Sequence, residues 1–167
     1  MALTDGIVTL RPLREDDVPL IHEACQDPLI PRFTRVPSPY TLEHAHAALE
    51  NDGDEIRRGI VGADDRLLGL CSLLRFAPGG RTCEVGYWLA PWGRGRGVAT
   101  RAVELICAWG FDTLGLERIE LHAHTENAAS RAVADRAGFT EFGRKVDPDG
   151  RKLALYARSA STASAAR

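Results

Sequence analysis

The chain has 167 residues, of which 44% are hydrophobic and 26% charged, the balance of an ordinary globular protein. Its net charge of −2 gives no reason to expect a nucleic-acid partner. No apolar run approaches the roughly 18 residues that a membrane span requires, and the first residues lack the pattern of a signal peptide. We therefore expect a cytoplasmic protein with no membrane partner, whose four cysteines are reduced and buried.

Hydrophobic periodicity predicts a mixed series of strands and helices. The expected elements are, in chain order, a strand at 7–13, a helix at 16–25 with Asp16 as its N-cap, a proline-rich loop at 27–40, a helix from Thr41, strands at 57–63, 67–76 and 82–89, a helix at 98–112, a strand at 118–125, a short helix between Asn127 and Gly138, and strands at 139–146 and 151–158. This order predicts an α/β (α+β) fold with one central, mostly antiparallel sheet and helices on both faces. We expect residues 1–158 to form a single domain and residues 159–167 to be a disordered tail.

A glycine- and arginine-rich segment, Pro91–Thr100, follows an expected strand and opens an expected helix. Such a junction suits a phosphate group, because the helix N-terminus presents free N–H groups and glycines let the backbone approach an anion closely. Arg94 and Arg96 add positive charge. The segment lacks the spacing of a P-loop, and because residue 100 is Thr it also lacks the third glycine of a dinucleotide-binding loop. Taken alone, it is as consistent with a surface turn as with a phosphate site.

Four segments together resemble the GCN5-related N-acetyltransferase (GNAT) family. The segment Arg94–Ala99 matches the acetyl-CoA signature of that family, Q/R-x-x-G-x-G/A. The others resemble its ribosomal-protein (RimJ/RimL-like) branch: Thr9–Leu13 followed by Asp16 and Asp17, then Glu84–Leu89, and then Asn127–Ser130 followed by Ala137–Phe139. The resemblance covers about residues 7–158 and implies a GNAT fold, acetyl-CoA as cosubstrate, and two splayed strands that hold it.

The resemblance also assigns residues to the bound cosubstrate. It implies that backbone amides of the loop bind the pyrophosphate of coenzyme A, and that a backbone N–H at the end of the preceding strand polarises the acetyl carbonyl. It further implies that Asn127 contacts the pantetheine arm and that the Ser130 hydroxyl lies near the sulfur, although both residues also suit a helix start without any function. The cofactor-binding residues expected on this basis are Trp88, Leu89, Ala90, Arg94, Gly95, Arg96, Gly97, Val98, Ala99, Thr100, Asn127 and Ser130.

Glu84 is the expected general base, acting directly or through a water molecule. Its side chain points away from those of its two neighbours in the strand, and the family resemblance places a glutamate of this strand near the acceptor amine. A solvent-facing glutamate is the alternative. Many GNAT enzymes carry a tyrosine as general acid where this chain has Ala134. Protonation of the leaving thiolate is therefore assigned to Ser130, with Tyr156 or water as alternatives.

The expected reaction is a direct transfer of acetyl to a primary amine. An α-amine, with an ordinary pKa of about 8, needs less help from a base than a lysine with a pKa of about 10.4, so a protein N-terminus is the expected acceptor. The alternatives are a small amine, such as an aminoglycoside, a polyamine or an amino-acid analogue, and a catalytically silent coenzyme A-binding module. No metal site is expected, and the chain is expected to be a monomer or a homodimer.

Residues 27–40 and the helix after them are expected to cover the acceptor, with Phe33, Pro37, Pro39 and Tyr40 as candidate walls. Residues 41–66 contain seven acidic residues against three arginines. A solvated face explains such a composition most simply. The other hypothesis is that this acidity draws a cationic acceptor.

Overall fold

The computed structural model of the chain describes residues 1–50 and 54–161. These residues form an eight-stranded sheet with the strand order β1-β2-β3-β4-β5-β6-β8-β7. The strands are β1 (Leu3–Thr4), β2 (Thr9–Arg11), β3 (Glu55–Val61), β4 (Leu67–Leu74), β5 (Thr82–Leu89), β6 (Arg118–His124), β7 (Thr140–Val146) and β8 (Lys152–Ser159). Within this sheet β5 and β6 are parallel and the other neighbours antiparallel, so the expected mostly antiparallel sheet is confirmed.

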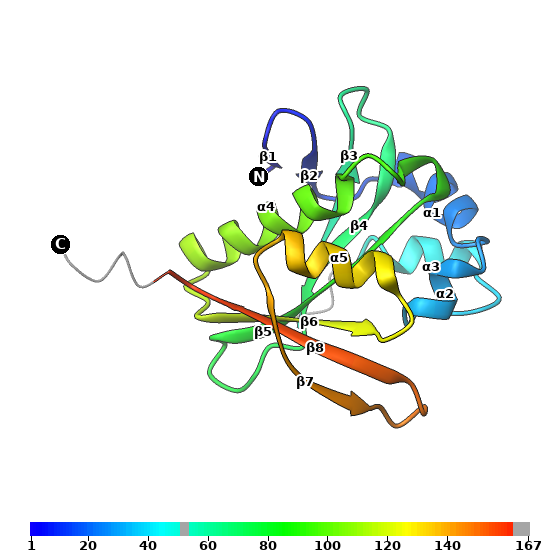
Figure 1. Ribbon diagram of the computed structural model, residues 1–167. Coiled ribbons are helices and arrows are strands. Elements are labelled where there is room, and N and C mark those ends of the chain that lie inside the picture. Colours follow the sequence, from blue (N-terminus) through cyan, green and yellow to red (C-terminus); the bar gives the residue numbers. More distant parts are fainter. Residues whose placement is uncertain (51–53, 162–167) are drawn as a thin grey trace.

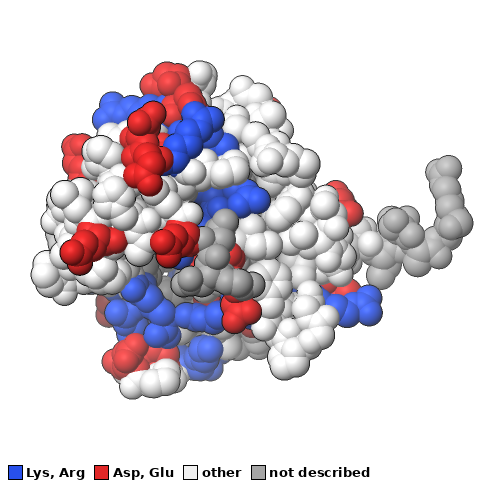
Figure 2. All heavy atoms as spheres, turned by 180° about the vertical axis from the view of Figure 1, so that it is seen from behind, with Lys and Arg blue, Asp and Glu red and all other residues white. Residues whose placement is uncertain are grey.

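Helices cover both faces of the sheet. Over the described residues they are α1 (Val18–Ala24), α2 (Leu29–Phe33), α3 (Leu42–Ala47), α4 (Val98–Asp112) and α5 (Ala128–Arg136). Figure 1 shows α4 and α5 together in front of the sheet, and α1, α2 and α3 gathered at the right of the view. None of these helices is long and apolar enough to cross a membrane. On the face shown in Figure 2, charged side chains of both signs are interspersed.

Strand alternation gives each face of the sheet its own apolar cluster. In β4, Cys71 packs into the cluster of α4 and α5, whereas its neighbour Leu70 packs into the cluster of α1 and α3 on the opposite face. In β6, Ile119, Leu121 and Ala123 are all buried in the α4–α5 cluster, as the alternation predicts. The four cysteines are free and buried, which agrees with the sequence expectation.

The N-terminal helices differ from their expected bounds. The segment 27–40, which its prolines marked as a loop, contains α2. Pro28 is the N-cap of α2 and Pro31 falls within its first turn, where a helix needs no N–H donors. The first helix begins at Val18 rather than at Asp16, because Glu15–Asp17 form a 3-10 turn instead.

The C-terminal strand is longer than expected. Ser159 pairs with Arg118 in the sheet, and the Ala160 N–H donates to the Glu117 carbonyl over 2.9 Å. The expected disordered tail therefore does not include Ser159 and Ala160. Residues 162–167 of that tail lie outside the described residues.

The parallel pair of strands separates after a short contact. β5 and β6 pair only over Thr82–Glu84 and Arg118–Glu120. Beyond that contact, β5 remains paired with β4 as far as Leu89, whereas β6 remains paired with β8 as far as His124. The two strands must diverge, since each follows its other partner. We call the gap between residues 85–89 and residues 121–124 the fork.

Candidate active site

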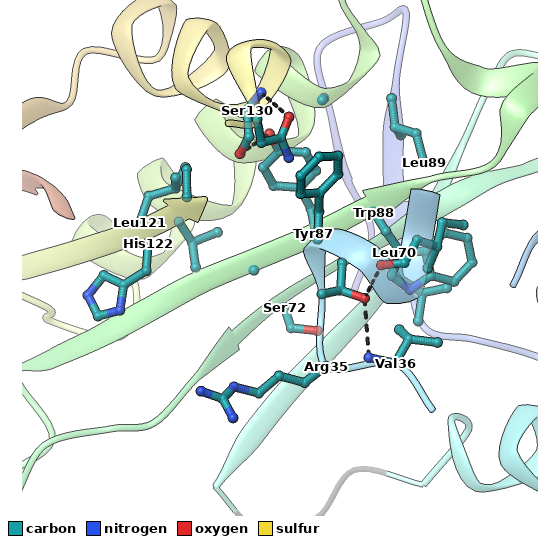
Figure 3. Close-up of a pocket in the computed structure, with 18 of the residues that line it drawn as sticks. Arg35, Val36, Leu70, Ser72, Tyr87, Trp88, Leu89, Leu121, His122 and Ser130 are labelled. Carbon is teal, nitrogen blue, oxygen red and sulfur yellow. Dashed lines mark hydrogen bonds between the residues drawn. The ribbon is translucent and has the colours of Figure 1, made fainter. Parts of the chain in front are cut away.

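The fork opens into a cleft of about 1140 Å³. Its walls come from the two diverging strands, from the first turns of α4 and α5, from residues 33–37, and from the turn between β7 and β8. Figure 3 shows Tyr87 and Ser130 together on one side of this space, with His122 and Arg35 on the other. The cleft is large enough for an extended cosubstrate and an acceptor.

One end of the cleft is a row of free backbone donors. The N–H groups of residues 95–100 have no acceptor among the residues that the structure describes, because α4 starts at a glycine N-cap without a capping side chain. Gly95 and Gly97 have φ values of +77° and +69°, in the left-handed region that favours glycine. Gly95, Gly97, Val98, Ala99 and Thr100 line the cleft. This end therefore suits a phosphate-bearing group.

The arginines of the loop have other partners. Arg94 donates to the Asp27 carboxylate over 2.8 Å and to the Leu89 carbonyl over 3.0 Å. Burial alone would raise the pKa of Asp27, but the Leu29 N–H and Arg94 together lower it, so the pair is charged at neutral pH. Arg96 donates to the Trp92 carbonyl over 3.0 Å and lines a neighbouring hollow instead of the cleft. The loop therefore faces the cleft with its backbone, and the Arg94 side chain ties the loop to Asp27 and to the end of β5.

The main chain of β5 offers donors at alternate residues. The Ala90 N–H donates to the Leu68 carbonyl of β4 over 2.8 Å, and Ala90 does not line the cleft. In an antiparallel ladder the next N–H groups along the strand point the other way, so those of Leu89 and Tyr87 face the fork. Trp88 lines the cleft through its side chain. Of the three residues expected at the strand end, Leu89 therefore has the N–H that faces the fork, and Ala90 does not.

Ser130 lies at the centre of the fork, beside a residue that sequence analysis missed. Asn127 caps α5 by accepting the Ser130 N–H over 3.1 Å, as expected of an N-cap. The Tyr87 hydroxyl lies 2.9 Å from the Ser130 hydroxyl. Burial raises the pKa of Tyr87 to about 12, so Tyr87 stays protonated and is the donor. The signal for Tyr87 was its place in β5, where it faces the same side as buried Val85.

Two other positions considered for the acid do not line the cleft: Ala134, where many GNAT enzymes carry a tyrosine, and the alternative acid Tyr156. Ala134 is fully buried in the α4–α5 cluster. The Tyr156 hydroxyl accepts from Arg131 over 3.1 Å, and Tyr156 does not line the cleft. This leaves Ser130, held by Tyr87, as the hydroxyl beside the fork.

Glu84 sits where the strands begin to separate, within a chain of charged groups. Its side chain is 15% exposed and accepts from Arg75 over 2.6 Å. His122 Nδ1 lies 3.4 Å from Glu84 Oε2 and, although buried, has no hydrogen-bond partner among the described residues. His122 Nε2 lies 2.9 Å from Glu120. Glu120 stands opposite Glu84 in the parallel register, which no local pattern in the sequence shows.

The acceptor side agrees only in part with expectation. Phe33, Pro37 and Tyr40 line the cleft, but Pro39 does not. Of the seven acidic residues in 41–66, only Glu55 lines the cleft within the described part of the chain, and Asp52 lies outside the described residues. No group of three or more histidine, cysteine or carboxylate side chains in the described ranges could hold a metal ion.

Comparison with known proteins identifies the family of this chain. The family model for the acetyltransferase (GNAT) domain matches residues 8–140, and the chain therefore belongs to the GNAT family of N-acetyltransferases. Relatives named as ribosomal acetyltransferases support the RimJ/RimL-like branch. YdaF of Bacillus subtilis, provisionally named a ribosomal N-acetyltransferase, is 37% identical over 84 residues, which cover 50% of this chain and 46% of YdaF.

Two further matches cover more of the chain. The spermidine N(1)-acetyltransferase of Escherichia coli K12 is 29% identical over 140 residues, covering 81% of this chain and 74% of that protein. The solved structure of the ribosomal L7/L12 α-N-protein acetyltransferase RimL in complex with coenzyme A superposes with a TM-score of 0.85. It covers 95% of this chain and 98% of RimL at 20% identity, and so shows the fold alone.

Proposed function

We propose that this protein transfers acetyl from acetyl-CoA directly to a primary amine, and that the amine is a protein N-terminal α-amine. The observation that carries the proposal is the fork itself. It joins a row of free N–H groups at one end to a partly buried carboxylate, Glu84, at the other. We also propose that residues 1–158 act as a single domain.

The residues around the fork fit coenzyme A. Six successive backbone N–H groups, at 95–100, are available to phosphate oxygens. Gly95 and Gly97 have left-handed φ values and no side chain that could block the approach of an anion. The gap between β5 and β6 leaves the Leu89 and Tyr87 N–H groups for an extended pantetheine arm to pair with. When bound, acetyl-CoA supplies the acetyl thioester.

Three groups of this chain would then act on the reacting atoms. The N–H of Leu89 or Tyr87 would polarise the acetyl carbonyl. Glu84 would accept the proton of the amine, and His122 beside it would share that proton. The Ser130 hydroxyl, whose oxygen accepts from Tyr87, keeps its own hydrogen free to donate to the leaving sulfur.

The surroundings of Glu84 favour an acceptor that needs little help to lose a proton. Arg75 donates to Glu84 Oε2 over 2.6 Å and competes with the acceptor for that oxygen. About a tenth of an α-amine is already uncharged at neutral pH, whereas the pKa of a lysine lies about three units above neutral pH. An N-terminal α-amine therefore matches the base better than a lysine does.

The test combines binding with turnover. Calorimetric titration with acetyl-CoA and with free coenzyme A should show one site per chain, with micromolar affinity. Release of thiol with an N-terminal peptide acceptor should follow, and Glu84→Gln should lower it while leaving coenzyme A affinity unchanged. Failure to bind either ligand at millimolar concentration would remove the proposed function.

A further inference from the structure

We infer that the acceptor carries carboxylate groups close to its amine, as a peptide with an acidic N-terminal segment does. This inference rests on the proposed function, because it names the class of acceptor for the same cleft. It comes from the charged side chains around Glu84, which lie on the sheet face opposite α4 and α5.

Strand registers place these side chains on one face. Glu84 stands beside Leu74 of β4, which in turn stands beside Glu55 of β3. Paired residues in neighbouring strands share a face, so Glu55 lies on the side of Glu84. Lys145 of β7 stands beside Leu153 of β8, which stands beside His124 of β6, two residues from His122. Strands on both sides of the fork, β3 and β7, therefore contribute charge to this face.

Each acidic side chain that lines the cleft is already paired with an arginine. Glu55 accepts from Arg57 over 2.7 Å, and Glu84 accepts from Arg75 over 2.6 Å. The Asp147 carboxylate lies 3.4 Å from Arg35. Among the described residues that line the cleft, no carboxylate is left for a polycation to bind.

Basic side chains are in excess at the same place. Those lining this part of the cleft are Arg35, Arg57, Arg75, Lys145 and Arg151, against Glu55, Glu84 and Asp147. Arg151 donates to the Thr34 carbonyl over 2.9 Å, a neutral partner. Figure 2 shows Lys and Arg side chains close together near the middle of one face, with acidic side chains beside them.

A nearby histidine responds to this charge. Burial lowers the pKa of His124 and the Arg151 guanidinium lowers it further, while Asp147 and Glu126 act in the opposite direction without reversing the shift. The surplus of positive charge in the cleft favours a ligand with anionic groups, because it repels a cationic ligand. The partly buried walls of the cleft strengthen this effect. A polyamine would bring several positive charges against these arginines, whereas an acidic peptide would meet Arg151 and Lys145.

Matched peptides test the inference. Three peptides of equal length would share an N-terminal serine and differ only in the next residues, which are acidic, amide or basic; spermidine is the fourth acceptor. We expect kcat/KM for the acidic peptide to exceed that for the amide peptide by about tenfold at low ionic strength, and to fall as salt is added. The basic peptide and spermidine should be the poorest acceptors.

Charge reversal on one hairpin gives the control. Lys145→Glu should lower the preference for the acidic peptide several-fold. Lys152→Glu makes the same change in net charge on β8. Both lysines are exposed, but Lys152 does not line the cleft, and it neighbours Leu153 in the strand, so it points to the other face. Lys152→Glu should leave the preference unchanged. Arg151→Lys, which keeps the charge, should retain most of the preference.

The outcomes separate the inference from the proposed function. Thiol release that is equal for all peptides, or greater for the basic peptide, would overturn the inference and leave the proposed function intact. Thiol release that is greatest with spermidine would overturn both the inference and the proposed α-amine acceptor, and would leave acetyl transfer to an amine. If Lys145→Glu and Lys152→Glu change the preference for the acidic peptide equally, the preference comes from the net charge of the protein. That result would overturn the inference that the cleft selects the acceptor. Thiol release with none of the four acceptors, despite coenzyme A binding, would remove the proposed function and the inference with it.

Discussion

The Tyr87 hydroxyl of β5 lies 2.9 Å from the Ser130 hydroxyl of α5, beside the fork. Burial raises the pKa of Tyr87 to about 12, so Tyr87 is neutral and protonated below that pH and donates to Ser130. A serine hydroxyl that accepts one hydrogen bond becomes a better donor of its own hydrogen. The pair therefore supplies, at the proposed position of the sulfur, the hydrogen bond that the alanine at 134 does not.

The first prediction concerns this pair. Tyr87→Phe and Ser130→Ala should each lower kcat by about tenfold or more, and the double variant should lose little beyond the Ser130→Ala variant, because Tyr87 acts through Ser130. Because Tyr87 titrates only near pH 12, the loss in Tyr87→Phe should be the same factor from pH 6 to pH 10. Steady-state kinetics across that range check this. Additive losses, or a shifted pH profile, would show that the two hydroxyls act separately.

A second prediction concerns the proton of the acceptor amine. Glu84→Gln should lower kcat/KM by about a hundredfold, within the range of a general base. His122→Gln removes the group 3.4 Å from Glu84 while keeping an amide near Glu120, and should lower kcat/KM by a smaller factor and alter its pH profile. Coenzyme A affinity measured by calorimetry should stay unchanged in both. If His122→Gln changes only thermal stability, His122 has a structural role alone.

The phosphate-binding loop gives a third prediction, with an internal control. Gly97 and Gly115 have nearly equal φ values, +69° and +68°, and a methyl group at either would meet open space. Gly97→Ala and Gly115→Ala should therefore cost similar stability, about 1 kcal/mol each. Only Gly97 lines the cleft, so only Gly97→Ala should weaken coenzyme A binding, by about tenfold in Kd. Equal affinities in the two variants would mean that the backbone at Gly97 makes no contact with the ligand.

Local patterns in the sequence were enough to place the loop, the strands other than β1, and the faces of β5 and β6. The glycines at 95 and 97 marked the start of α4, and alternation placed Glu84 on the side opposite to the α4–α5 cluster. Asn127 was expected as the N-cap of α5, and the structure confirms it. These features depend on residues within a few positions of one another, where spacing alone determines the geometry.

Partners far apart in the chain could not be predicted in this way. Glu120 meets Glu84 through the parallel register, and Arg94 meets Asp27 across 67 residues. The same holds for Tyr87 and Ser130, which are 43 residues apart. Alternation says which face a side chain occupies but leaves the register between strands open, and register decides which groups touch. This is why the arginines of the loop were expected at phosphate, whereas Arg94 in fact holds a carboxylate.

The last prediction concerns the opening motif of the chain, whose role is structural. Arg11 and Asp17 form a two-pronged ion pair with distances of 2.8 Å and 2.9 Å, and their side chains are only 6% and 5% exposed. Hydrogen bonding to Asp17 raises the pKa of Arg11 above its ordinary value, so Arg11 stays positively charged in the fold. Arg11→Met leaves the buried Asp17 carboxylate without its charged partner. Asp17→Asn leaves Arg11 with Asp65 alone, a carboxylate more than half exposed that lies 2.8 Å from the Arg11 Nε and also pairs with Arg14.

Each of these variants should lower the free energy of unfolding by about 3 to 5 kcal/mol. Arg14→Ala is the matched control, because Arg14 pairs with Asp65 over 2.7 Å while both side chains are more than half exposed. An exposed pair of this kind contributes about 1 kcal/mol or less. Urea unfolding at neutral pH compares the three variants with the parent chain. A loss in Asp17→Asn no greater than in Arg14→Ala would show that water reaches the Arg11–Asp17 pair and that its burial does not make it essential.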